Sequence, residues 1–239
     1  MLKIFSISDL HLSINNPKPM DIFGPAWDNY VDLIFDDWTK KVSNQDVVLI
    51  PGDISWAMKL EDAKVDLDLI SALPGNKIII RGNHDYWWKS ISAVRSLLPN
   101  NFFALQNDHI CLGNYIFCGT RGWQVPETTH KTPEDEKIYK RELIRLELSL
   151  SSAKTAQENM KKEGIDAKIV CMIHYPPFNS KKEESDFTKL FEKYEVSTVV
   201  YGHLHGTKSR TNHLTQINGI CYYLTSCDLV ENKLIPINV

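Results

Sequence analysis

Residues 78–85 read IIIRGNHD, an apolar run that passes directly into a polar turn. Three consecutive isoleucines are typical of a strand that is buried on both faces. Four similar short runs lie elsewhere in the chain, at residues 4–7, 47–50, 169–173 and 199–201. Amphipathic stretches separate these runs, so the sequence predicts the alternating strands and helices of an α/β fold.

The intervening helices are predicted from apolar residues that recur at spacings of three and four. One such face extends from Trp27 to Val42, and weaker patterns cover residues 60–73, 90–98 and 185–194. The charged stretch 133–163 carries one apolar stripe and is predicted to be a long helix. If that helix breaks, we expect the break near Ser149–Ser152.

Two segments depart from this alternation. Residues 111–116 and 214–224 read as hairpins that turn at Gly113-Asn114 and at Asn218-Gly219. Asn-Gly is the strongest signal for a two-residue hairpin turn. Some strands are therefore expected to be antiparallel, which makes the predicted sheet mixed.

The composition is that of an ordinary globular protein and favours one domain over residues 1–239. The chain has 239 residues, of which 43% are hydrophobic and 24% charged, and its formal net charge is −3. This balance excludes a disordered chain and argues against a strongly basic protein that binds long nucleic acid.

Cellular context is suggested only by weak signals. The five cysteines form no C-x-x-C motif, so free and mostly buried thiols are expected. The N-terminus has no apolar signal core, and no apolar run approaches the roughly 18 residues of a membrane span. We expect a cytoplasmic protein, and the sequence leaves its oligomeric state open.

Polar side chains that bind metals or move protons follow each of the five apolar runs. Because ligands of open α/β sheets bind outside the carboxyl ends of the strands, we expect these side chains to meet there. Each signal alone has a plain structural explanation, since Gly-Asp and Asn-His-Asp are ordinary turns. Their occurrence at five strand ends favours a site. The expected metal ligands are Asp9, His11, Asp53, Asn83, His174, His203 and His205.

This mixture of oxygen and nitrogen ligands suits Mn, Fe or Zn better than Ca. Seven ligands exceed the need of one tetrahedral site. They fit two metal ions about 3.5–4 Å apart, a pair that clamps a phosphoryl group and turns a bridging water into hydroxide. Asp53, on a short turn behind a glycine, is the natural candidate to bridge the two ions. His84 stands beside Asp85, and a carboxylate next to an imidazole suits a general acid.

The same motifs resemble the calcineurin-like metallophosphoesterase superfamily, in the order of that family and over nearly the whole chain. The resemblance implies a four-layer α/β/β/α sandwich with two mixed β-sheets and a dinuclear metal centre. It assigns one metal ion to Asp9, His11, Asp53 and His205. The other would be held by Asp53, Asn83, His174 and His203.

The resemblance also implies roles beyond metal binding. His84 would donate a proton to the leaving group or stabilise the transition state, and Asp85 would orient it. Arg81 stands where protein Ser/Thr phosphatases have an arginine that contacts phosphate. The opening Ser8–Leu12 is similar to the bacterial lipid A branch, but that branch usually has arginine where His84 stands.

The expected activity is hydrolysis of a phosphomonoester or phosphodiester by a metal-bridging hydroxide, on a small phosphorylated substrate. Two alternatives remain: a non-catalytic metal-binding scaffold, and a nuclease that acts on short nucleic acid. A complete ligand set together with His84 argues against the scaffold. The net charge and the absence of a basic run argue against a nuclease for long polymers.

Several residues near the motifs have two interpretations. Aromatic side chains beside the strand ends either line a pocket or pack the following helices, and packing is favoured for Trp88. The polar segment 124–136 is read as a surface loop, with a rim over the pocket as the alternative. The aromatic residues are Trp56, Trp87, Trp88 and Trp123, and the histidines outside any motif, expected to be solvated, are His109, His130 and His213.

Overall fold

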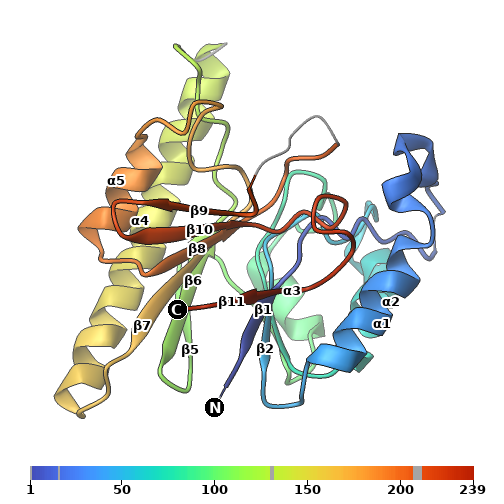
Figure 1. Ribbon diagram of the computed structural model, residues 1–239, viewed down its shortest axis with the longest axis horizontal. Helices are drawn as coiled ribbons and strands as arrows, with labels where there is room; N and C mark the ends of the chain where they lie inside the picture. The colour runs from blue at the N-terminus through green and yellow to red at the C-terminus, as the bar shows by residue number, and fades with distance from the viewer. Residues whose placement is uncertain (1, 16, 130–131, 207–211) are drawn as a thin grey trace.

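The computed structural model describes residues 2–15, 17–129, 132–206 and 212–239. Two β-sheets lie face to face, and helices cover the outer side of each sheet (Figure 1). This arrangement confirms the predicted four-layer α/β/β/α sandwich. The helices on the first sheet are α1 (Tyr30–Lys41), α2 (Leu60–Ala72) and α3 (Ile91–Leu97), and those on the second are α4 (Pro133–Lys162) and α5 (Asp186–Lys193).

The first sheet has five strands in the order β11-β1-β2-β3-β4. β1 to β4 are parallel, and β11 pairs antiparallel with β1. β4 and β11, the two edge strands of this sheet, were not predicted. The strands are β1 (Ile4–Ser6), β2 (Val47–Ile50), β3 (Asn76–Ile79), β4 (Phe102–Ala104) and β11 (Ile235–Ile237).

The second sheet has six strands in the order β5-β6-β7-β8-β10-β9. Its four central strands are parallel, and both predicted hairpins supply its antiparallel edges, β5 with β6 and β9 with β10. Both sheets are therefore mixed, as expected. The strands are β5 (His109–Leu112), β6 (Tyr115–Thr120), β7 (Lys168–Ile173), β8 (Thr198–Tyr201), β9 (Leu214–Ile217) and β10 (Ile220–Leu224).

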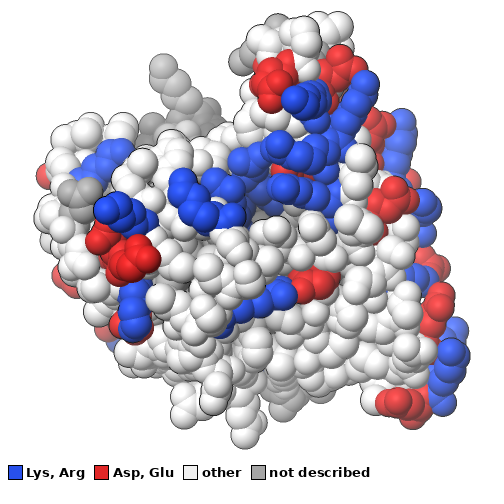
Figure 2. Space-filling model, turned by 180° about the vertical axis from the view of Figure 1, so that it is seen from behind, with Lys and Arg blue, Asp and Glu red and all other residues white. Residues whose placement is uncertain are grey.

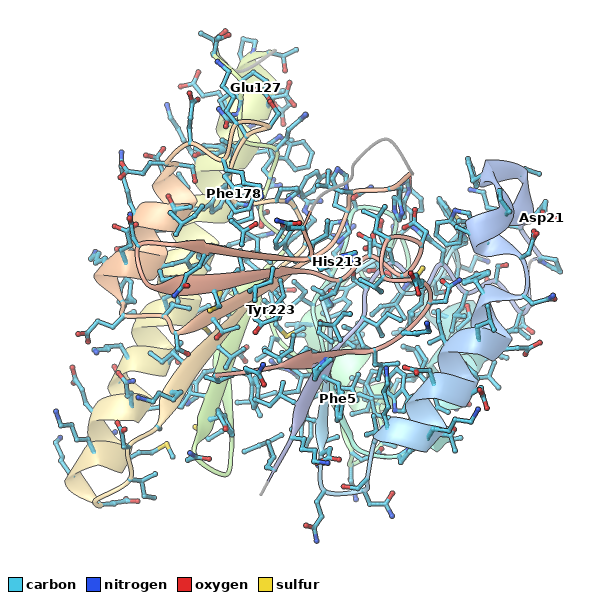
Figure 3. All side chains as sticks on the ribbon, in the orientation of Figure 1. Phe5, Asp21, Glu127, Phe178, His213 and Tyr223 are labelled. Carbon is cyan, nitrogen blue, oxygen red and sulfur yellow. The ribbon has the colours of Figure 1, made fainter. Side chains whose placement is uncertain are left out.

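Three apolar layers hold the sandwich together. Side chains alternate along β2, so that Val48 and Ile50 face the helices of the first sheet while Val47 and Leu49 face the second sheet. Tyr223 of β10 contributes to the layer between the sheets, whereas Phe5 of β1 packs outward (Figure 3). Strands buried on both faces explain why the runs are uniformly apolar.

The long helix α4 differs from expectation in one respect. It runs without a break through residues 149–152, because Ser149 turns inward and uses its hydroxyl within the fold. That hydroxyl donates to Asp108 O and accepts from Gly119 N, so the serines dock the helix on the second sheet rather than interrupt it. Among the described residues, no helix is both long and apolar enough to cross a membrane.

The two sheets are joined directly at the carboxyl ends of their central strands. Ser8, just beyond β1, donates its backbone N–H to Thr225 O of the second sheet at 2.8 Å. The hydroxyl of Ser6 lies 3.2 Å from that of Thr225. These bonds fix the relative position of the strand ends at which the polar side chains were predicted to meet.

Candidate metal centre

The strand-end side chains predicted as metal ligands lie together where the two sheets meet. Asp53 follows β2, and its Oδ2 lies 3.8 Å from Nε2 of His11 and 3.5 Å from Nε2 of His174. Oδ1 of Asn83 lies 2.6 Å from Nε2 of His174 and 2.9 Å from Nδ1 of His203. Predicted ligands from both sheets therefore converge at one place.

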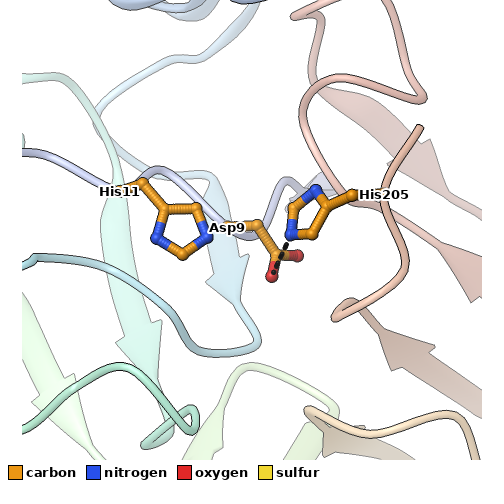
Figure 4. Close-up of side chains that lie close together, drawn as sticks. All are labelled: Asp9, His11 and His205. Atoms are coloured by element: carbon orange, nitrogen blue, oxygen red, sulfur yellow. Dashed lines mark ion pairs between the residues drawn. The ribbon is translucent and has the colours of Figure 1, made fainter. Parts of the chain in front are cut away.

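Two groups in this cluster have the geometry of a metal site. The ligand atoms of Asp9, His11 and His205 all lie within 4.8 Å of one another (Figure 4). The same limit holds for Asp9, Asp53 and His174. Asp9 belongs to both groups, whereas the sequence singled out Asp53 as the shared ligand. Because Asp53 also approaches His11, both carboxylates lie between the two groups.

The backbone of the cluster adopts conformations that side chains rarely tolerate. Asp9, His11, Asp53 and His203 all have positive φ, between 45° and 71°. Such strain persists only where the surrounding structure enforces it, and it concentrates at functional sites. A Cβ at Gly82 would lie 2.1 Å from Oδ1 of Asp53, so the close approach of the two turns requires glycine there.

Two of the histidines are oriented by an oxygen partner on the ring nitrogen that faces away from the cluster. Nδ1 of His174 lies 2.9 Å from Pro51 O, which only accepts, so Nδ1 donates and Nε2 keeps its lone pair. Nδ1 of His205 likewise donates to Oδ1 of Asp228 at 2.8 Å, and Nε2 faces Asp9. An oxygen partner on the outer nitrogen is the usual arrangement for histidines that bind metals.

Burial keeps most of these imidazoles neutral. It lowers the pKa of His11 and of His174 to about 3, and that of His203 to about 4. Burial also opposes protonation of His205, but hydrogen bonds to Asp228 and Asp9 outweigh it and raise the pKa of His205 to about 10.

The carboxylates carry opposite shifts. Burial, followed by the charges of Asp9 and Asp85, raises the pKa of Asp53 well above its usual value. Burial also opposes ionisation of Asp9, but the hydrogen bond and charge of His205 lower its pKa. Among the described residues, neither carboxylate is paired with Lys or Arg. Buried carboxylates beside neutral imidazoles are the donor set that a divalent transition metal needs, so the residues fit such ions.

Comparison with known proteins agrees with this geometry. A family model described as calcineurin-like phosphoesterase matches residues 2–207. The chain belongs to the calcineurin-like phosphoesterase family. That membership supports a metal-dependent phosphoester hydrolase, and the candidate ligand groups described above are consistent with it.

Named relatives are distant. A curated protein from Vesicomyosocius okutanii, described as a probable cyclic nucleotide phosphodiesterase, is 24% identical over 172 residues, 68% of this chain and 63% of that protein. Two crystal structures share the fold. A Thermus thermophilus protein, TT1561, has a TM-score of 0.58 at 11% identity, covering 99% of this chain and 98% of its own. Phosphopantetheinyl hydrolase from Mycobacterium tuberculosis has a TM-score of 0.53 at 14% identity, covering 98% and 95%.

Asp85 was expected to orient His84, but its carboxylate is directed to other groups. The Asp85 carboxylate is fully buried and accepts the backbone N–H groups of the neighbouring turns. Its five donors are Ile54 N, Ser55 N and Trp87 Nε1 on one oxygen, and Asp53 N and Gly82 N on the other. Adjacent residues on a tight turn direct their side chains apart. The Asp85 carboxylate therefore connects the turn at Asp53 with the turn at Gly82 through hydrogen bonds.

His84 faces the open side of the cluster. Its backbone N–H donates to Oδ1 of Asp53 at 2.7 Å, which fixes the turn, and its ring lies 5.6 Å from that of His11. The hydroxyl of Tyr86 lies 3.4 Å from Nδ1 of His84. Burial, followed by the charge of Lys18, lowers the pKa of His84.

The tryptophans divide between wall and core. Trp56 stacks on His11 at 4.7 Å and lies 4.5 Å from His84, so it forms a wall of the cluster. Trp87 and Trp88 are buried in the core of the first sheet, as favoured for Trp88. Trp123 contacts Tyr175, whose ring lies 4.1 Å from that of His203.

An apolar cavity of about 360 Å³ adjoins His203. Tyr175 and Phe178 line it, and Figure 3 shows Phe178 in the loop that precedes α5. Its volume lies within the range of small-molecule sites. Gln124 and Glu127 also line it, so the segment 124–136 contributes to a pocket rim, which the surface-loop interpretation missed.

Three histidines were expected to be solvated. His213 is exposed. His109 is not fully solvated, because its Nδ1 lies 2.7 Å from the hydroxyl of Ser152 on α4. His130 lies outside the described residues. The five cysteines are free thiols, as predicted, and three of them are buried.

Asp228 is a residue that motif reasoning missed. It accepts from His205 Nδ1 and, at 2.9 Å, from the backbone N–H of Gly206. The available signal was its position four residues after β10, another strand end. Arg81 lies at the end of β3, and its Nε is buried with no hydrogen-bond partner among the described residues.

Proposed function

We propose that this phosphoesterase hydrolyses a small phosphomonoester or phosphodiester with two metal ions held by the strand-end ligands. Asp9, His11 and His205 would hold one ion, Asn83, His174 and His203 would hold the other, and Asp53 would be available to both. The observation that carries the proposal is the convergence of these seven side chains, with the imidazoles of His174 and His205 oriented by hydrogen bonds. Mn, Fe and Zn fit the donor set.

Bound metals would supply charge neutralisation at the phosphoryl group and a lowered pKa for water. The chain's own residues supply the rest. Asp53 fixes the His84 turn through the backbone N–H of His84, so the imidazole stays at the open side of the centre. His84, whose ring lies 5.6 Å from that of His11, would act through a hydrogen bond to the leaving oxygen or to the phosphoryl group.

Trp56 and the cavity beside His203 shape the space around the reacting ester. Trp56 restricts one side of His84, and Tyr175 and Phe178 offer an apolar surface for the leaving group. The name of the curated relative adds cyclic nucleotides to the substrates worth testing.

The test is a panel assay of the purified full chain with Mn. The substrates are an aryl phosphate, an aryl phosphodiester, a set of nucleotides and a cyclic nucleotide. We expect metal-dependent hydrolysis of at least one of them. His174→Ala should abolish it, whereas His213→Ala, an exposed histidine outside the centre, should match the parent. A chain that holds two metals and hydrolyses none of the panel would instead be a binding scaffold.

A further inference from the structure

A second, separate cavity of about 200 Å³ lies beside the metal centre. The carboxyl ends of β3 and β6 form its floor, and the first half of α4 forms one wall. We call it the arginine pocket. Its polar lining residues are Arg81, Lys89, Gln106, Thr120, Arg121, Arg141, Glu142 and Arg145.

The arginine pocket carries a large excess of positive charge. Four arginines and one lysine line it, against the single acid Glu142. Figure 2 shows that Lys and Arg side chains gather densely on one face of the molecule, the face turned away from the viewer in Figure 1. A concave surface with one sign of charge attracts ligands of the opposite sign.

Glu142 cannot neutralise this charge, because its single carboxylate is shared by three of the arginines. It is fully buried and accepts from Thr120 Oγ1 at 2.9 Å and from Arg145 at 3.0 Å. Arg141 and Arg121 approach the same oxygen at 3.5 and 3.6 Å. The carboxylate holds the arginines in place and leaves most of their charge and donors for a ligand.

Three donors of residues that line the pocket have no protein partner among the described residues. They are Nε of Arg81, Nε1 of Trp88 and Nε of Arg121, and all three are buried. A buried unpaired donor is unfavourable unless something accepts from it. Burial, and to a smaller extent the like charges of Arg81 and Arg141, lower the pKa of Arg121. An anion in the pocket would relieve both penalties.

The arginine pocket borders the metal centre directly. Arg81 precedes Asn83 by two residues, and Arg121 O accepts from the backbone N–H groups of His174 and Tyr175 at 3.0 and 3.1 Å. The charges of Arg121, in the pocket, and of Asp53, in the metal centre, both act on the Tyr175 hydroxyl. A substrate bound at the metals could therefore extend into the pocket.

We propose that the arginine pocket binds a second phosphate group of the substrate. The substrate class is then a phosphate ester that carries a further phosphate away from the bond that is cleaved. Arginine forks match phosphate oxygens, and the charge excess requires a multiply charged anion. Sites that hold a whole small molecule have volumes of about 300–1,000 Å³. The arginine pocket is smaller, so it suits one group of a larger molecule. This inference rests on the proposed function.

The test compares two double variants that remove the same charge. Lys89→Ala with Arg141→Ala removes two accessible cations of the pocket and leaves Arg121 and Arg145 to hold Glu142. The control, Lys137→Ala with Lys140→Ala, removes two exposed cations of α4 that pair with Glu134 and Glu136 outside the pocket.

The first readout is substrate preference with Mn. This preference is the kcat/KM of a bisphosphate divided by the kcat/KM of the matching monophosphate. One comparison uses adenosine 3′,5′-bisphosphate and the two adenosine monophosphates. The other uses fructose 1,6-bisphosphate and fructose 6-phosphate. The parent should prefer at least one bisphosphate, and the pocket variant should lose roughly 10- to 100-fold of that preference. The control should keep it. Equal preference in parent and pocket variant overturns the proposal.

The second readout does not need turnover. Calorimetric titration of inorganic phosphate into the metal-loaded chain should give two binding events, of which the pocket variant loses one and the control loses neither. Unchanged binding in the pocket variant overturns the inference even if aryl phosphate is hydrolysed. Two binding events in a chain that hydrolyses nothing would leave the pocket standing and refute the proposed function. If the pocket variant lost one phosphate-binding event but kept the preference for a bisphosphate, the pocket would bind free phosphate and not a phosphate of the substrate. That result would contradict the proposal.

Discussion

Replacing Asp85 by Asn should destabilise the protein and release its metals, although Asp85 is not a ligand. Each oxygen of Asp85 accepts from more than one donor, three on one oxygen and two on the other. An asparagine keeps one oxygen and turns an NH₂ toward the remaining donors. Whichever way the amide faces, at least two buried N–H groups lose their acceptor.

The magnitude follows from that count. A buried donor left without its partner costs about 1–3 kcal/mol, so two of them lower the free energy of unfolding by about 2–6 kcal/mol. For a chain of this size the melting temperature should fall by about 5–20 °C. The affected N–H groups belong to Asp53 and Gly82 or to the residues after Asp53, so the loop that carries a metal ligand shifts with them.

Calorimetry and elemental analysis would measure both effects. Asp166→Asn is the matched control, because that carboxylate is exposed and its substitution should change stability by less than about 0.5 kcal/mol. If Asp85→Asn melts within 2 °C of the parent and retains two metal equivalents, the assignment of Asp85 to the loops is wrong. A reduced kcat with unchanged stability and metal content would restore a role for Asp85 in orienting His84.

Three further outcomes are expected. Asp53→Asn should weaken both metal sites together and His11→Ala mainly one, and two tightly held equivalents by elemental analysis in Asp53→Asn would contradict this. His84→Asn should lower kcat by about 10²–10⁴-fold on an alkyl ester and less on an aryl phosphate, with both metals retained; loss of a metal would make His84 a ligand. Burial opposes ionisation of Asp46, but hydrogen bonds from Ser43 and Lys3 lower its pKa, so its stabilisation is present above pH 3.8 and is lost as the pH falls below that value. In urea unfolding, the free energy of unfolding of Asp46→Asn should therefore be lower than that of the parent at pH 7, and the difference should shrink as the pH falls. A difference that stays constant with pH would refute this linkage.

The positions of the polar residues at the strand ends could be predicted, because buried strands and functional residues have different sequence patterns. Strands covered on both faces must be apolar throughout, and a polar residue directly after such a run lies at the edge of the sheet. Asp9, Asp53 and His174 all follow this pattern, and the structure places them together. The same runs predicted an α/β fold, and the four-layer arrangement came from the family resemblance.

What the sequence could not give are the partners of buried polar groups. Asp85 stands beside His84 in the chain, yet its oxygens reach backbone N–H groups of residues 53–55, about thirty positions away. Glu142 looks like any acid on a charged helix, yet it is fully buried among arginines. Hydrogen-bond partners are set by tertiary proximity, and no local pattern records them.

The position of the centre between two sheets explains how ligands from distant parts of the chain come together. Asp9 and Asp53 extend from the first sheet, whereas His174 and His205 extend from the second, so each ligand group spans the junction. The bond from Ser8 N to Thr225 O and the contact of Asp9 with the backbone N–H of His203 hold the sheets together at this edge. Strained backbone at Asp9 and His203 is stable only because these contacts enforce it. The fold itself therefore brings the ligands of both sheets together at this edge.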